Sequence, residues 1–273
     1  MHPKMWTRSR LLVLGTTYPR YSRKYREVAC TGALREDTKE IVRLHPVPKR
    51  YLDEGKRFKA WQWITVDAAP HSEDPRSESI RIHPDSIELG PVIKDPEERR
   101  NYVERSPGIA DSIESMTAER PKGKLPKRSL AIVRPKAINL DKIYLKRRPE
   151  SERAEWEAIE RELLAQGAMF GQMKPIAFPE MGFHVPWRCD DNRCNGHDMR
   201  LNNWGLNELY RKLKFARDAN LNGKVIDLMR RELDTARYDI FFFVGTSRTH
   251  LTNFMLLDSL KVPKVGQMTM FGL

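Results

Sequence analysis

The first third of the chain alternates short apolar runs with polar turns, a pattern typical of β-strands. Proline and glycine separate the runs, as at residues 45–48. Strands of this length and spacing predict a small curved sheet or a partly open barrel, an architecture that commonly presents one face to nucleic acid. The expected strands are residues 11–14, 27–34, 41–44, 61–66 and 79–82.

The second half mixes helical and strand periodicity, which predicts an α+β unit. Residues 152–166 are the clearest helix, because Trp156, Ile159 and Leu163 recur at helical spacing and Gly167 follows as a stop. The apolar run at 240–244 predicts a buried central strand. Residues 254–260 are expected to pair with it. Further helices are expected at 206–216 and 224–236, and further extended segments at 130–133, 138–145 and 176–187.

These patterns divide the chain into four parts of an α+β protein. A β-rich domain is expected over residues 1–94, and a helical, basic connector over 95–128. An α+β domain follows over 129–262, and residues 263–273 form a flexible tail. The sequence shows no internal repeat at solenoid or propeller periods.

Composition excludes several classes of protein. The 273 residues are 40% hydrophobic and 32% charged, and no apolar run approaches the roughly 18 residues of a membrane span. The apolar block at 11–14 is too short for a secretory signal. Three cysteines cannot build a disulfide framework. A cytoplasmic location is therefore expected.

Positive charge is concentrated near the N-terminus. The net charge is +12, and residues 1–60 contain 15 basic and 6 acidic side chains. A localised basic surface indicates a polyanionic partner, because each neutralised phosphate releases counterions. The alternative is that lysine and arginine only solubilise the surface.

Tyrosines alternate with cations directly after the first expected strand, which favours nucleic-acid binding. Cations can hold phosphates while phenol rings stack on bases. The expected contacts are Tyr18, Arg20, Tyr21, Arg23, Lys24, Tyr25 and Arg26, with Lys122, Lys124, Lys127 and Arg128 in the connector. In the alternative interpretation the tyrosines are core anchors and the arginines cover them.

Two cysteines and a histidine lie within nine residues, at Cys189, Cys194 and His197. Thiolates and imidazole favour zinc, and Gly196 permits the sharp turn that such a loop needs. His184 is the nearest candidate for a fourth ligand. The other candidates are His250, Asp198 and a water molecule. A closed structural zinc site is expected to stabilise the C-terminal domain, and a reduced cysteine pair without metal is the alternative.

Acidic residues near these positions suggest an alternative interpretation, in which the protein is an enzyme. Asp190 and Asp191 could bind a second ion, and Asp239 with His250 could form a metal-dependent nuclease site at strand ends. Glu232 and Asp234 lie close to Asp239 in sequence. The phosphate-binding loop, the dinucleotide fingerprint and the hydrolase elbow are all absent from the sequence. No catalytic residue is assigned.

The last residues of the chain carry several apolar side chains, which is unusual for a solvated terminus. The segment Gln267-Met268-Thr269-Met270-Phe271 resembles the short peptide by which bacterial replication and repair proteins dock onto the β sliding clamp. The resemblance covers only these five residues. It implies that Gln267 makes hydrogen bonds and that Met270 and Phe271 fill an apolar pocket. A chance match, or a tail folded back onto its own domain, is the alternative.

Together these features favour a nucleic-acid-binding protein, with DNA as the first candidate. It would be associated with the nucleoid and recruited by the sliding clamp, in genome maintenance or in defence against foreign DNA. The alternatives are a metal-dependent nuclease acting on DNA or RNA, and a non-catalytic adaptor in a nucleoprotein complex.

Overall fold

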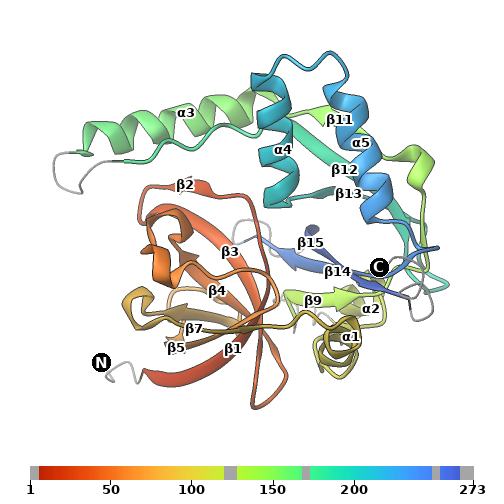
Figure 1. Cartoon of the computed structure of the whole chain (residues 1–273), viewed down its shortest axis with the longest axis horizontal. Coiled ribbons are helices and arrows are strands. Elements are labelled where there is room, and N and C mark those ends of the chain that lie inside the picture. Colours follow the sequence, from red (N-terminus) through yellow and green to blue (C-terminus); the bar gives the residue numbers. More distant parts are fainter. Residues whose placement is uncertain (1–5, 120–127, 168–172, 248–252, 265–273) are drawn as a thin grey trace, which may run out of the picture.

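The structure is a computed structural model that describes residues 6–119, 128–167, 173–247 and 253–264. Two β-rich units lie side by side, and the two helices between residues 204 and 232 pack on the second of them (Figure 1). The expected β-rich N-terminal region is confirmed, and so is the mixture of sheet and helices in the C-terminal half.

The N-terminal strands close into a five-stranded barrel. The order around the ring is β1-β3-β4-β6-β5, and β5 pairs with β1 to complete it. Neighbours are antiparallel except β4 and β6, which are parallel. The barrel is closed rather than partly open, because β1 pairs with β3 and β5 along its length. The strands of this unit are β1 (Thr7–Thr16), β2 (Arg20–Ser22), β3 (Arg26–Arg35), β4 (Ile41–Val47), β5 (Gln62–Pro70), β6 (Ser79–Ile82) and β7 (Glu88–Val92).

The second sheet repeats this topology. Its order is β10-β12-β13-β15-β14-β9-β8, and β11 also pairs with β12. If β9 to β11 are counted together as the first strand, β13 is the third and β15 the fifth. These two are parallel, as β4 and β6 are in the first unit, and β8 and β9 are parallel as well. The first strand is split here: β9 pairs with β14, whereas β10 and β11 pair with β12. The strands are β8 (Ile109–Ala110), β9 (Leu130–Val133), β10 (Ala137–Ile138), β11 (Tyr144–Arg147), β12 (Met181–Arg188), β13 (His197–Leu201), β14 (Tyr238–Thr246) and β15 (Phe254–Pro263).

This strand order is that of an OB-fold barrel, in which the second and third strands and the loops beside them form the usual ligand face. Both halves of the chain therefore have OB-like topology. The continuous strand expected at 138–145 is wrong, since the short helix η4 (Leu140–Lys142) interrupts it.

Two strands have continuous apolar sequences because both of their faces are buried. On β1, Leu11 and Val13 point into the first barrel, whereas Leu12 and Leu14 pack against the second unit. On β14, Phe243 packs in this same shared core, and the residue before it, Phe242, faces the interior of the second unit. Alternate side chains of a strand point to opposite faces, so a strand between two cores needs apolar residues throughout.

The expected helices are present with shifted ends. The long helix α3 (Glu150–Ala165) lies alongside β2. Pro149 occupies its N-cap position, and no side chain caps its N-terminus. Asn203 caps α4 with its side chain. The helices are α1 (Pro96–Glu104), α2 (Ile113–Ala118), α3, α4 (Trp204–Phe215) and α5 (Leu221–Glu232), with short 3-10 turns η1 (Lys49–Tyr51), η2 (Glu54–Lys56), η3 (Pro84–Ser86) and η4.

The expected connector is largely structured where it is described. Helix α1 packs against β15, and β8 adds a parallel strand to the edge of the second sheet beside β9. Residues 109–118 thus belong structurally to the second unit. Within the described ranges, no helix is both long and apolar enough to cross a membrane.

Candidate functional site

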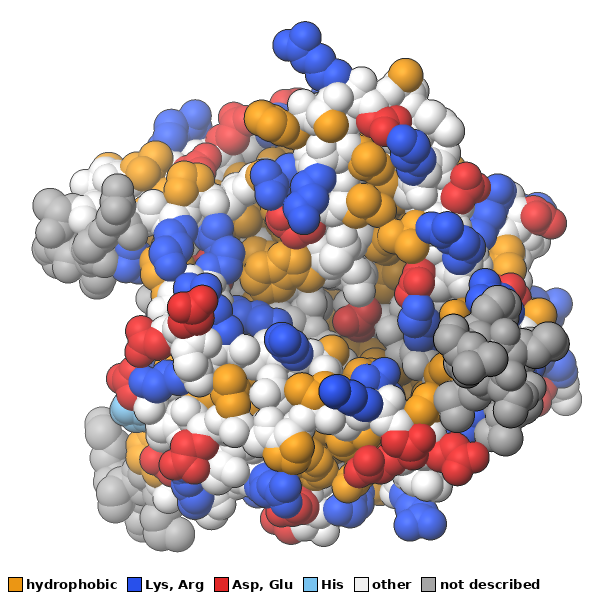
Figure 2. Space-filling model, viewed as in Figure 1, with side chains coloured by type: hydrophobic (Ala, Val, Ile, Leu, Met, Phe, Trp, Pro, Cys, Tyr) orange, Lys and Arg blue, Asp and Glu red, His pale blue; other side chains and the backbone are white. Residues whose placement is uncertain are grey.

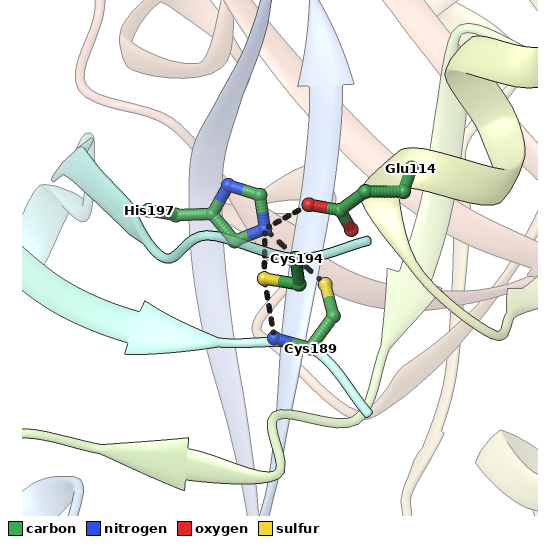
Figure 3. Close-up of side chains that lie close together, drawn as sticks. All are labelled: Glu114, Cys189, Cys194 and His197. Atoms are coloured by element: carbon green, nitrogen blue, oxygen red, sulfur yellow. Dashed lines mark hydrogen bonds and ion pairs between the residues drawn. The ribbon is translucent and has the colours of Figure 1, made fainter. Parts of the chain in front are cut away.

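Four side chains converge at one end of the second sheet. Nε2 of His197 lies 3.3 Å from Sγ of Cys189 and 3.4 Å from Sγ of Cys194. The fourth member is Glu114, whose Oε1 lies 3.3 Å from the same nitrogen (Figure 3). All four candidate ligand atoms lie within 4.8 Å of one another. The cluster therefore has the composition and size of a mononuclear metal site.

These distances fit the tetrahedral coordination of a metal ion. Zinc binds sulfur at about 2.3 Å and nitrogen or oxygen at about 2.0–2.2 Å, so neighbouring ligands in a tetrahedron are about 3.3–3.8 Å apart. Both cysteines are buried, and Oε2 of Glu114 is buried without a hydrogen-bond partner among the described residues. Burial raises the pKa of the Cys189 thiol to about 12 and lowers the pKa of His197. A dication would offset the cost of forming a buried thiolate.

The local backbone shapes the loop as the sequence predicts. Gly196 has φ of +100°, a conformation that side chains disfavour, and it joins the cysteine loop to β13. The backbone amide of Cys189 donates to Sγ of Cys194, and that of Ile113 donates to Sγ of Cys189. Such bonds orient thiolate ligands.

A hydrogen bond at the start of α2, the helix that carries Glu114, fixes this helix against the cysteine loop. The Ser112 hydroxyl caps α2 and also donates to the Asp191 carboxylate at 2.6 Å. Since Asp191 lies between the two cysteines, this bond ties α2 to the cysteine loop. The Asp191 carboxylate also receives bonds from Arg193, and these bonds together keep its pKa well below its usual range.

The expectation that His184 is the fourth ligand is wrong. His184 lies within β12, which rises about 3.3 Å per residue, so it is about 16 Å along the strand from Cys189. Its Nδ1 pairs with Asp198 at 3.1 Å, and its ring stacks on Tyr144. Asp198 is likewise engaged away from the cluster, and His250 lies outside the described residues.

The acidic residues considered for a nuclease do not come together. Asp190 pairs with Lys136, and Asp191 has the structural role given above. Asp239 is buried and bridges Arg100 and Arg134, at 2.8 Å from the latter. A carboxylate neutralised by two guanidinium groups is not available for a metal ion. Among the described residues, the structure offers no cluster of acids that supports the nuclease interpretation.

Some side chains of the tyrosine- and arginine-rich stretch at residues 18–26 pack in the core or form ion pairs within the protein. Tyr18 and Tyr21 are buried beside Trp156, which agrees with the alternative that these tyrosines are core anchors. Arg23 pairs with Glu162 at 2.6 Å, and Lys24 pairs with Glu73.

The remaining members of the stretch have other surroundings. The Tyr25 ring packs edge-on against His45, and the Arg26 guanidinium lies over the Tyr51 ring. Arg20 is exposed and has no ion-pair partner in the described parts of the chain. In the connector, Arg128 binds the backbone carbonyls of residues 107 and 109. Lys122, Lys124 and Lys127 lie outside the described residues, as do Gln267, Met270 and Phe271.

A cavity of about 630 Å³ lies between the two units. Each unit contributes its second and third strands, which are β3 and β4 in the first and β12 and β13 in the second. Each also contributes the loops after its first and fourth strands. The two OB-like ligand faces therefore face each other across one cavity. Figure 2 shows basic side chains on both sides of the hollow between the units.

Among the charged side chains of the cavity wall, Arg20, Arg148 and Arg200 form one group with Glu152. Arg148 donates to Oε2 of Glu152 at 2.7 Å, and Arg200 donates to its Oε1 at 3.3 Å. Burial, and then the charge of Arg200, lowers the pKa of Arg148 to about 10, with a smaller contribution from Arg20. A cation whose pKa is lowered by neighbouring cations is short of negative charge. Arg200 and Glu114 were not predicted from the sequence because they lie far along the chain from the residues they contact. Arg148 and Glu152 are only four residues apart, a spacing that could have indicated their ion pair.

The fold and these sites define a protein of two OB-like barrels with a shared cavity and a cluster suited to a metal ion. Residues 109–272 match a family described as a domain of unknown function (DUF8757), and residues 7–105 match a second family described in the same way (DUF8758). Since the first match covers more than half of the chain, the protein belongs to the DUF8757 family. No curated protein and no solved structure matches it significantly.

Proposed function

We propose that this protein binds nucleic acid, with DNA as the first candidate, where the two OB-like barrels face each other. The observation that carries the proposal is that the second and third strands of both barrels line the same arginine-bearing cavity. These strands and their adjoining loops are the surfaces on which OB-folds bind oligonucleotides. The net charge of +12 favours a polyanion.

The charge that supports this proposal comes from both halves of the chain. Arg23 and Lys24 are neutralised by protein carboxylates, so the basic stretch contributes less than its composition suggests. Arg20 remains without an ion-pair partner among the described residues, and it lines the cavity together with Arg148 and Arg200 of the second unit.

We also propose that the cluster of Glu114, Cys189, Cys194 and His197 holds a structural zinc ion. Two buried thiolates and an imidazole suit zinc better than magnesium or calcium, which prefer oxygen ligands. Four protein ligands leave no open position for a substrate, so the ion would serve stability rather than catalysis. It would fasten α2 to the β12–β13 loop.

The first test measures binding of a fluorescent single-stranded DNA by anisotropy at several salt concentrations. Affinity is expected to fall linearly on a log–log plot as salt rises. Arg20→Ala should weaken binding several-fold and reduce the slope by about 0.7, as loss of one phosphate contact to a single strand does.

Arg23→Ala is the matched control, since it removes the same charge from the turn directly after β2, but Arg23 is already paired with Glu162. It should leave the slope nearly unchanged. Absence of salt-dependent binding to DNA or RNA would refute the proposed function.

We further propose that the terminal peptide recruits the protein to the β sliding clamp, in genome maintenance or in defence against foreign DNA. The support is the sequence resemblance at residues 267–271. In a pull-down with purified β clamp, Met270→Ala with Phe271→Ala should abolish binding without changing the melting temperature. Met268→Ala is the control, because Met268 occupies a position that the motif does not specify. Equal retention of all variants would contradict clamp recruitment.

A further inference from the structure

The inter-barrel cavity has the size of a small-ligand site. Its volume of about 630 Å³ falls within the roughly 300–1,000 Å³ typical of pockets that bind small molecules. A double helix cannot enter such a space, whereas one nucleotide can. The inference below rests on the proposed function and names the chemical unit that the cavity accepts.

Two of the arginines that line the cavity are already saturated. Arg76 forms a two-pronged ion pair with Asp74 and donates to the Thr246 carbonyl at 2.6 Å. Arg43 is buried and donates to Glu78 and to the hydroxyl and carbonyl oxygens of Ser129. These two side chains hold the barrels together, and they have little capacity left for a ligand.

Arg20 and Arg200 differ in this respect, whereas Arg148 holds Glu152 through two of its nitrogens and donates to the Pro179 carbonyl at 3.4 Å. Glu152 is the carboxylate that Arg148 and Arg200 share, and no described residue forms an ion pair with Arg20. Glu155 also lines the cavity but forms no ion pair with them. Even with both carboxylates counted, this group carries a net positive charge. A phosphate has several acceptor oxygens and suits a group of guanidinium donors.

A second polar region lines the same cavity. The Thr246 hydroxyl is buried and has no hydrogen-bond partner among the described residues. Burial, and then the charge of Arg76, lowers the pKa of His45 to about 4, so its ring is neutral and offers one donor and one acceptor. Buried polar groups usually have partners, so an unpaired hydroxyl on a cavity wall indicates a ligand or water there.

Apolar side chains complete the wall. Phe183 and Met181 come from β12, and Met255 and Leu257 come from β15. A surface of this kind suits the flat face of a base, which can stack on aromatic and sulfur-containing side chains.

We propose that the cavity binds one nucleoside 5′-monophosphate unit, free or at the end of a strand. Its phosphate lies on Arg20, Arg148 and Arg200 and competes with Glu152 for Arg148 and Arg200. Its base lies against the apolar wall, within reach of the polar groups Thr246 and His45.

Calorimetric titrations test this proposal with four 2′-deoxynucleoside 5′-monophosphates, the matching nucleosides and inorganic phosphate. At least one monophosphate should bind, and its nucleoside should bind at least tenfold more weakly. Arg200→Ala should weaken binding of the monophosphate about tenfold to a hundredfold, as expected for loss of a charged hydrogen bond. Arg161→Ala is the matched control, because Arg161 is exposed on α3 and does not line the cavity.

Glu152→Gln separates a binding role from a structural one. If a phosphate competes with Glu152, removing this carboxylate charge should tighten binding severalfold. If the ion pairs are only structural, Glu152→Gln and Arg200→Ala should both lower stability, and neither should change affinity specifically.

Comparison with oligonucleotides separates this inference from the proposed function. A 5′-phosphorylated oligonucleotide that binds tightly, with no binding of monophosphates and no effect of Arg200→Ala, would overturn the inference and leave nucleic-acid binding intact. Binding of monophosphates without any binding of DNA or RNA would support the inference and overturn the proposed function.

Discussion

Cys194→Ser is expected to release one zinc ion per chain and to lower the melting temperature by about 10 °C. The free energy of binding a structural metal is also folding free energy, because the ligands converge only in the folded chain. A loss of about 3–5 kcal/mol lowers the melting temperature of a protein of this size by roughly 2–4 °C per kcal/mol. Metal content by mass spectrometry and thermal unfolding by circular dichroism measure the two effects.

Two comparisons make this test specific. Cys30→Ser is the matched control, since Cys30 is a half-buried cysteine on the cavity wall and does not belong to the metal-ligand cluster. It should retain zinc and melt close to the unchanged protein. Glu114→Gln should weaken zinc binding, whereas His184→Gln should not. The zinc proposal would be contradicted if the purified protein contained no stoichiometric metal and its melting temperature did not change when a chelator was added.

Phe243→Ala is expected to lower the free energy of unfolding by about 3–5 kcal/mol, as large truncations in a core do. Phe243 is almost completely buried in the core shared by the two barrels. Its ring also lies against Gly32 of the first barrel, where an added Cβ would be 2.1 Å from Cζ. Gly32→Ala should therefore destabilise the protein by about 1–3 kcal/mol or more, through overpacking.

Combining the changes tests whether this contact joins the barrels. Gly32→Ala with Phe243→Leu should cost less than the sum of the two single substitutions, because the smaller side chain makes room for the added methyl group. Gly55→Ala is the control, since nothing lies within 4 Å of a Cβ built at Gly55. Urea unfolding measures all variants. Additive effects in the double variant would show that the two positions do not contact each other.

The strands that lie between two cores were the easiest to predict. Residues 11–14 and 240–244 are apolar without interruption, and burial on both faces is the physical reason for that pattern. The OB-like order of either unit was not predictable in the same way. Pairing of β4 with β6, and of β13 with β15, depends on contacts between strands that no local pattern encodes.

The sequence predicted only those members of the candidate metal site that lie close together along the chain. Cys189, Cys194 and His197 share one loop, so their spacing revealed them. The fourth member, Glu114, comes from a short helix that lies in a different part of the sequence. His184 is close to Cys189 in sequence, but the extended strand β12 separates their side chains in space.

The sequence by itself determined the two-part, β-rich character of this protein, its excess of positive charge and three members of its metal-ligand cluster, because composition and periodicity are local properties of the chain. Only the tertiary structure decided which cations are neutralised by distant carboxylates and which arginines line the cavity. It also decided that the two barrels turn corresponding faces toward each other. Charge pairing and facing surfaces depend on distances in space, and the order of residues along a chain does not specify these distances until the chain is folded.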